Sequence, residues 1–295
     1  MNKLGTQPTV NMPQSVVTPT PIAEDFLTQR SEDIQAAIAK ENKKSTFPTV
    51  IVDLPSKGLL YPQGHPLASG TVEMKYMTAK EEDILTTESY IKSNIVFDKL
   101  FQSLLVTPFE YESLIAGDRD AIMIAARIHG YGEVYNVKVT APSGEELEVG
   151  VDLNDLKPKQ WDESAIVPHN NSFAFELPMS KALVEFKILT VGDGKQLESK
   201  GSVKKYKTPG SPDHNVTERL SKQILSINGE SDPNFIKLFV NNELRAMDSI
   251  ALRRHIASLT PGINMEIELE DPRSGEPFRT SVSIGLDFFW PDFGV

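Results

Sequence analysis

The chain has 295 residues, of which 39% are hydrophobic and 24% charged, a composition typical of a soluble globular protein and not of a disordered one. The absence of cysteine excludes disulfides, thiolate metal sites and cysteine nucleophiles. The formal net charge of −11 opposes non-specific nucleic-acid binding, which would need a local basic patch. No apolar run reaches the roughly 18 residues that span a bilayer, and the N-terminus is not expected to be a secretory signal.

Residues 1–46 are predicted to form a flexible tail. Residues 1–21 are rich in Thr, Pro, Gln and Asn and hold too few apolar side chains to offset the entropy cost of ordering. Residues 23–43 have a helical composition with one narrow apolar stripe, and such a helix is marginal alone in water. It therefore either docks on a partner or serves as a loosely helical spacer. The candidate partner-binding residues of the stripe are Leu27, Ile34 and Ile38.

The folded part is expected to begin with strands at 49–54 and 71–77. Thr78 and Glu81 have the spacing of a capping box, which predicts a helix at 79–86. The charged run at 80–83 is interpreted as a solvated helix face. A second helix at 93–105 places four core residues on one face, namely Phe97, Leu100, Phe101 and Leu104.

A helix followed by a hairpin is predicted next. The helix covers 118–129 and ends at a Gly-Tyr-Gly sequence, and alternating strands follow at 134–140 and 146–152. The same order returns near the C-terminus, with a helix at 248–259 and strands at 265–270 and 278–286. Because a unit that occurs twice indicates a repeat, we expect an internal duplication.

Other positions match across the two halves at nearly constant spacing. Strand 182–189 resembles strand 71–77, and Asp248 aligns with Asp120. The predicted fold is α+β, with two similar, internally duplicated domains of short antiparallel strands and a small helical group. The predicted boundaries are a tail at 1–46, a first repeat at 47–155, a linker at 156–170 and a second repeat at 171–295.

No catalytic, cofactor or metal site is predicted, because the sequence holds no known catalytic motif and its histidines lack ligand spacing. Residues 192–195 (GDGK) are too short for a phosphate-binding loop and are expected to form a flexible turn. His129 and His255 lie near the ends of the two long helices, where a protonated imidazole would interact with the helix C-terminus. Asp118 and Asp120 fit a helix start.

Two further segments are candidates for binding. The lysine-rich run from Lys195 to Lys207 could contact nucleic acid or an acidic partner, but a solvated loop is favoured because the run has no arginine and one aromatic residue. The C-terminus concentrates aromatic residues that either pack on the core or anchor a partner, and packing with partial exposure is favoured. These residues are Phe288, Phe289, Trp290 and Phe293.

Several long motifs resemble one known family. They are 54–62 (LPSKGLLYP), 64–70 (GHPLASG), 77–85 (MTAKEEDIL), 117–122 (GDRDAI), 126–132 (ARIHGYG) and 288–291 (FFWP). Together they are similar to the baseplate protein, or baseplate hub subunit, of T-even-like contractile-tailed bacteriophages. The resemblance covers most of 47–295, is looser in the second half and leaves the tail outside. It implies a structural or assembly role without enzymatic activity.

The sequence therefore predicts a baseplate hub component, or a factor needed to build the hub, that acts through protein–protein contacts. The expected partners are other hub or tail proteins, with a homo-oligomer as a further option, and neither nucleic acid nor a membrane. The expected location is the virion tail baseplate, after assembly in the host cytoplasm. Two alternatives stay open: an assembly chaperone absent from the finished particle, and a nucleic-acid-binding module that uses the Lys195–Lys207 loop.

Overall fold

A computed structural model describes residues 48–203 and 215–289, together with their side chains except at 199–203 and 215. The predicted tail and its helix lie outside the described residues. So do several candidate partner-binding residues, namely Leu27, Ile34, Ile38, Trp290 and Phe293.

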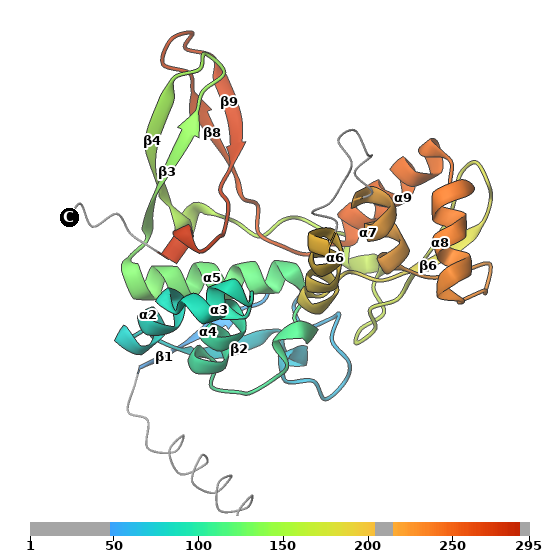
Figure 1. Ribbon diagram of the computed structural model, residues 1–295, viewed down its shortest axis with the longest axis horizontal. Helices are drawn as coiled ribbons and strands as arrows, with labels where there is room; N and C mark the ends of the chain where they lie inside the picture. Colours follow the sequence, from blue (N-terminus) through green and yellow to red (C-terminus); the bar gives the residue numbers. More distant parts are fainter. Residues whose placement is uncertain (1–47, 204–214, 290–295) are drawn as a thin grey trace, which may run out of the picture. The chain divides into compact units, whose positions relative to one another are not determined.

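The fold is α+β, as predicted, with helices and several small antiparallel sheets (Figure 1). The elements up to residue 155 are β1 (Thr49–Asp53), η1 (Pro66–Ser69), β2 (Thr71–Lys75), α2 (Ala79–Thr86), α3 (Glu88–Lys92), α4 (Val96–Leu104), η2 (Tyr111–Ser113), α5 (Ala116–Tyr131), β3 (Val134–Thr140), β4 (Glu146–Asp152) and η3 (Leu153–Asp155). Strand β1 pairs with β2, and β3 with β4.

The described elements beyond residue 155 follow a related order. They are η4 (Glu163–Ala165), β5 (Phe173–Glu176), β6 (Leu183–Phe186), α6 (Val191–Val203), α7 (Asn215–Gln223), β7 (Ile224–Ile227), α8 (Pro233–Asn242), α9 (Ala246–Leu259), β8 (Glu266–Glu270), β9 (Pro277–Ser281) and η6 (Asp287–Phe289). Strands β5, β6 and β7 form one sheet, and β8 pairs with β9.

Helix α2 begins at the predicted capping box. One carboxylate oxygen of Glu81 accepts hydrogen bonds from the Thr78 backbone N–H at 2.8 Å and the Thr78 hydroxyl at 2.7 Å. The other accepts from the Ser103 hydroxyl at 2.5 Å, which ties α2 to α4. Glu81 is therefore buried, and the prediction that 80–83 is wholly solvated is wrong at this position.

Helix α6 begins in a similar way, and this corrects a second prediction. The segment 192–195 lies in the first turn of α6 and not in a flexible turn. Asp193 accepts a hydrogen bond from the Thr190 backbone N–H at 3.2 Å. Its buried carboxylate also forms ion pairs with Lys187 at 2.7 Å and Lys222 at 3.3 Å, so that α6, α7 and the end of β6 are held together.

Two buried carboxylates hold loops onto the two long helices. Asp118 accepts from the Ser56 N–H at 2.9 Å, the Ser56 hydroxyl at 2.6 Å and the Tyr61 hydroxyl at 2.6 Å. Asp248 accepts from the backbone N–H groups of Met179 at 2.7 Å and Ser180 at 3.1 Å. Each carboxylate belongs to the third residue of its helix.

The hydrophobic core contains buried residues from both halves of the described chain. The Val191 N–H donates to the Leu114 carbonyl at 2.8 Å, and the Lys159 N–H, in the predicted linker, donates to the Gly262 carbonyl at 2.7 Å. A Cβ atom on Gly117 would lie 2.2 Å from the Pro261 carbonyl oxygen. The start of α5 therefore packs directly against the chain that leads into β8.

Candidate partner-binding site

The C-terminal aromatic residues within the described chain are packed inside. Phe288 and Phe289 are both fully buried, with ring centroids 5.4 Å apart. The Phe288 ring contacts Tyr135 of β3 at 4.9 Å, and the Phe289 ring lies 6.4 Å from Phe97 of α4. The expected partial exposure is therefore wrong for these two residues, which fasten η6 to the core and are not presented to a partner.

Arg127 of α5 connects three parts of the chain. Its guanidinium donates to the carbonyls of Phe288 at 3.0 Å, Gly132 at 3.1 Å and Val134 at 3.4 Å. It also lies over the rings of Tyr131 at 5.2 Å and Tyr135 at 5.9 Å. The side chain is buried, and within the described chain it forms no ion pair with a carboxylate.

Burial lowers the pKa of the Arg127 guanidinium, and the two neighbouring tyrosines oppose that shift. An arginine nevertheless stays protonated. No functional role of Arg127 was predicted from the sequence. The available signal was a charged residue between Ala126 and Ile128, on the apolar part of a helix.

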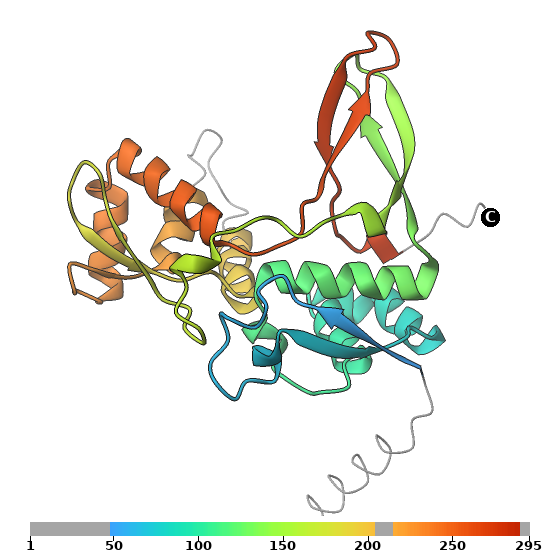
Figure 2. The same ribbon diagram turned by 180° about the vertical axis from the view of Figure 1, so that it is seen from behind.

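The two long hairpins lie side by side (Figures 1 and 2). Their turns are joined where the Ser143 N–H donates to the Asp271 carboxylate at 2.9 Å. The same carboxylate accepts from the backbone N–H groups of Arg273 at 2.9 Å and Ser274 at 3.3 Å, which shapes the β8–β9 turn. These bonds, after the opposing effect of burial, keep the pKa of Asp271 below its usual value.

Among residues 48–203 and 215–289, no further strand pairs with either hairpin, so the edges of both are free. The alternation of hydrogen-bonded pairs decides which residues form these edges. In the β3–β4 hairpin the Leu153 N–H donates to the Glu133 carbonyl and the Ala141 N–H to the Glu145 carbonyl. Because antiparallel pairs alternate, the backbone groups of every second residue of β3 point away from β4. These outward residues are Val134, Asn136, Lys138 and Thr140.

The β8–β9 hairpin alternates in the same way. The Val282 N–H donates to the Met265 carbonyl, and the Asp271 N–H to the Glu276 carbonyl. The backbone groups of Arg279 and Ser281 therefore point away from β8 along the free edge of β9.

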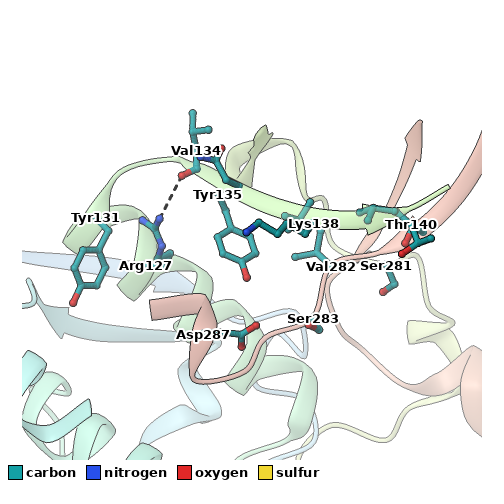
Figure 3. Close-up of a pocket in the computed structure, with 14 residues that line it drawn as sticks. Arg127, Tyr131, Val134, Tyr135, Lys138, Thr140, Ser281, Val282, Ser283 and Asp287 are labelled. Atoms are coloured by element: carbon teal, nitrogen blue, oxygen red, sulfur yellow. Dashed lines mark hydrogen bonds between the residues drawn. The ribbon is translucent and has the colours of Figure 1, made fainter. Parts of the chain in front are cut away.

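A cavity of about 570 Å³ lies between these two edges. Strand β3 lines one side and the segment 280–283 the other, while Arg127, Tyr131 and Asp287 lie at its base (Figure 3). In the close-up the Tyr135 ring extends from β3 into the space above Asp287. Backbone groups of a free strand edge can pair with an added strand, so this groove is suited to peptide binding.

Two further features concern metal ions and membranes. Within residues 48–203 and 215–289, no group of three or more His, Asp or Glu side chains is arranged to hold a metal ion. None of the described helices is long and apolar enough to cross a membrane.

The lysine-rich run from Lys195 to Lys207 was predicted to be a solvated loop, and its first residue does not fit that prediction. Lys195 belongs to α6, pairs with Asp98 at 2.5 Å and lies 4.9 Å from the centroid of the Tyr111 ring. It is thus occupied by an intramolecular ion pair and not part of a solvated loop. The other lysine side chains of the run lie outside the described residues, namely Lys200, Lys204, Lys205 and Lys207.

Of the two histidines in the long helices α5 and α9, one agrees with its prediction and the other does not. His129 lies in the last turn of α5, as expected, and stacks on Tyr76 at 5.0 Å. His255 stacks on Phe175 at 4.5 Å, and burial lowers its pKa although Asp162 opposes the shift. His255 also lies outside the last turn of α9, so the predicted interaction with the helix C-terminus is wrong for this residue.

Comparison with known proteins identifies the class of this molecule. The model of a family described as T4 bacteriophage base plate protein matches residues 48–289. The chain belongs to this family and is a structural protein of the phage baseplate, as the motifs predicted. No curated protein and no solved structure gives a significant match.

Proposed function

We propose that this chain is a subunit of the baseplate hub that remains in the virion and acts through protein–protein contacts and not through catalysis. The observation that carries the proposal is the family match over residues 48–289, which includes all four hairpin strands β3, β4, β8 and β9. Assembly in the host cytoplasm belongs to the same proposal.

The two long hairpins, β3–β4 and β8–β9, support a role in assembly. A two-stranded hairpin is at best marginally stable alone in water, and it leaves both of its edges free for pairing. Here Arg127 and Phe288 hold the β3–β4 hairpin against α5 and η6, and the hydrogen bond from Ser143 to Asp271 joins the turn of the β8–β9 hairpin to it. A scaffold that fixes free strand edges in place is suited to binding neighbouring proteins.

The proposal is tested by co-expression of the full chain with the other hub proteins of the same phage, followed by pull-down. We expect a complex that persists through size-exclusion chromatography. Deletion of residues 1–44 and, separately, of 290–295 tests whether either end anchors the complex, as the candidate residues in those segments predict. A full-length, folded chain that binds no hub protein would contradict the proposal.

We also propose that the two halves arose by internal duplication. The proposal is supported by paired features: a Thr with an acidic residue three positions later at the start of α2 and α6, and a buried carboxylate at the third position of α5 and α9. Loss of the second buried carboxylate should then resemble loss of the first, as described below.

A further inference from the structure

The four free edges of the two long hairpins, β3–β4 and β8–β9, carry different charges. The outward positions of β4 and β8 are mostly acidic: Glu146, Glu148 and Asp152 together with Gly150 on β4, and Glu266, Glu268 and Glu270 on β8. Acidic side chains along an edge strand repel an acidic segment that would pair there, because like charges on neighbouring strands are destabilising. The corresponding positions of β3 and β9 hold no acidic residue: they are Val134, Asn136, Lys138 and Thr140 on β3, and Pro277, Arg279 and Ser281 on β9.

The two edges without acidic residues are those that face the groove. Asn136, Lys138 and Thr140 line one side of the 570 Å³ cavity, and Ser281 and Ser283 line the other. The chain therefore keeps acidic residues on the two edges away from the groove and leaves the two edges at the groove open for pairing.

The base of the groove adds a positive charge. Arg127 is buried, and its hydrogen bonds to described residues run to carbonyl groups only. A buried charge without an opposite charge is costly, and a carboxylate brought by a ligand would reduce that cost. Lys138 at the rim adds a second positive charge, and among the described residues it forms no ion pair, while Asp287 is the one carboxylate that lines this cavity.

We propose that this groove binds an extended, acidic segment of another baseplate protein, which pairs with the free edge of β3 and places a carboxylate near Arg127. The inference rests on the proposed function and specifies the partner's chemistry. A lone extended segment fits because the groove offers a free edge on each side. A hairpin strand from a second copy of this chain would arrive with one edge already paired.

The test uses short overlapping synthetic peptides that cover the other baseplate proteins of the same phage, titrated against the full chain by fluorescence anisotropy. The matched variants are Lys138→Pro and Glu148→Pro, because these residues are paired across the β3–β4 ladder and direct their N–H groups to opposite free edges. Each substitution removes one outward donor and no ladder bond, so both variants should fold. Circular dichroism and the thermal midpoint confirm folding.

We expect acidic peptides to bind, and Lys138→Pro to weaken binding about tenfold or more, while Glu148→Pro leaves it unchanged. Replacing Glu and Asp by Gln and Asn in a bound peptide should weaken it, and added salt should do the same. In hydrogen exchange, the amides of Asn136, Lys138 and Thr140 should become protected in the complex.

Four results would overturn the inference. The first is equal loss of binding in the two proline variants. The second is no peptide binding by a chain that still purifies with the hub proteins, in which case the proposed function survives. The third is a dimer of the chain that Lys138→Pro abolishes, which would assign the groove to a second copy. The fourth is peptide binding that appears only after deletion of 290–295, which would assign the groove to the chain's own end.

Discussion

Removal of the Asp118 carboxylate tests how the first loop is held on the long helix. Asp118 is fully buried and accepts three hydrogen bonds, two from Ser56 and one from Tyr61. The same network continues, because the Tyr61 hydroxyl accepts from the Ile115 N–H at 3.0 Å and the Ser56 hydroxyl from the Gly58 N–H at 3.2 Å. The carboxylate therefore joins the loop after β1 to the start of α5.

Asp118→Ala leaves three donors without their acceptor, and each orphaned buried group costs about 1–3 kcal/mol. The donors share one acceptor, so the costs are not additive, and we expect a loss of about 3–5 kcal/mol in the free energy of unfolding. For a folded unit of this size, that loss lowers the thermal midpoint by about 6–20 °C.

The assay is urea unfolding followed by circular dichroism, with Asp120→Ala as the matched control. Asp120 lies two residues away in the same helix, and its partly exposed carboxylate pairs with Arg119 at 2.6 Å. Such a pair contributes about 1 kcal/mol or less. If Asp118→Ala destabilises the protein no more than Asp120→Ala does, the network does not hold the loop and the argument is refuted.

Three other perturbations have defined outcomes. Asp248→Ala orphans two backbone N–H groups and should cost about 2–4 kcal/mol in urea unfolding, whereas a loss below 1 kcal/mol would contradict the assigned role. Hydrogen bonds hold the pKa of Glu81 below its usual value despite burial, and hydrogen bonds together with lysine charges do the same for Asp193. The stability that these two carboxylates contribute is therefore present above their unfolded pKa values near 4. It is lost as the pH falls through their pKa values in the folded protein. Asp193→Asn should flatten that loss in urea midpoints measured against pH, and an unchanged slope would count against it. Gly117→Ala places a Cβ 2.2 Å from the Pro261 oxygen and should lower the free energy of unfolding by about 1–3 kcal/mol, which is measured as a lower thermal midpoint. An unchanged midpoint would show that the contact is loose.

Local patterns predicted the elements whose stability is itself local. The bounds of β3 and β4 agree with their alternation and turn, and those of α2 agree with its capping box. The predictions fit here because neighbours along the chain supply the hydrogen bonds. The short strand β7, in contrast, was not predicted, since its four residues are stabilised by pairing with β6.

The polar residues of the interior could not be assigned from the sequence. Asp118 resembles an ordinary helix-start residue until Ser56, 62 positions earlier, is seen to donate to it. Arg127 similarly depends on the Phe288 carbonyl, 161 positions later. The groove could not be predicted from the sequence for the same reason. Alternation of side chains predicts strands but not which strand edges face each other, and the groove lies between the β3–β4 and β8–β9 hairpins, which are far apart in the sequence.

The central claim, that this chain is a hub subunit retained in the particle, is tested most directly by quantitative mass spectrometry of purified virions. If the chain is retained, purified virions should contain its peptides in a fixed ratio to those of other baseplate proteins, across independent preparations. Peptides abundant in infected cells but missing from purified virions would contradict it and favour an assembly factor that leaves before the particle is complete.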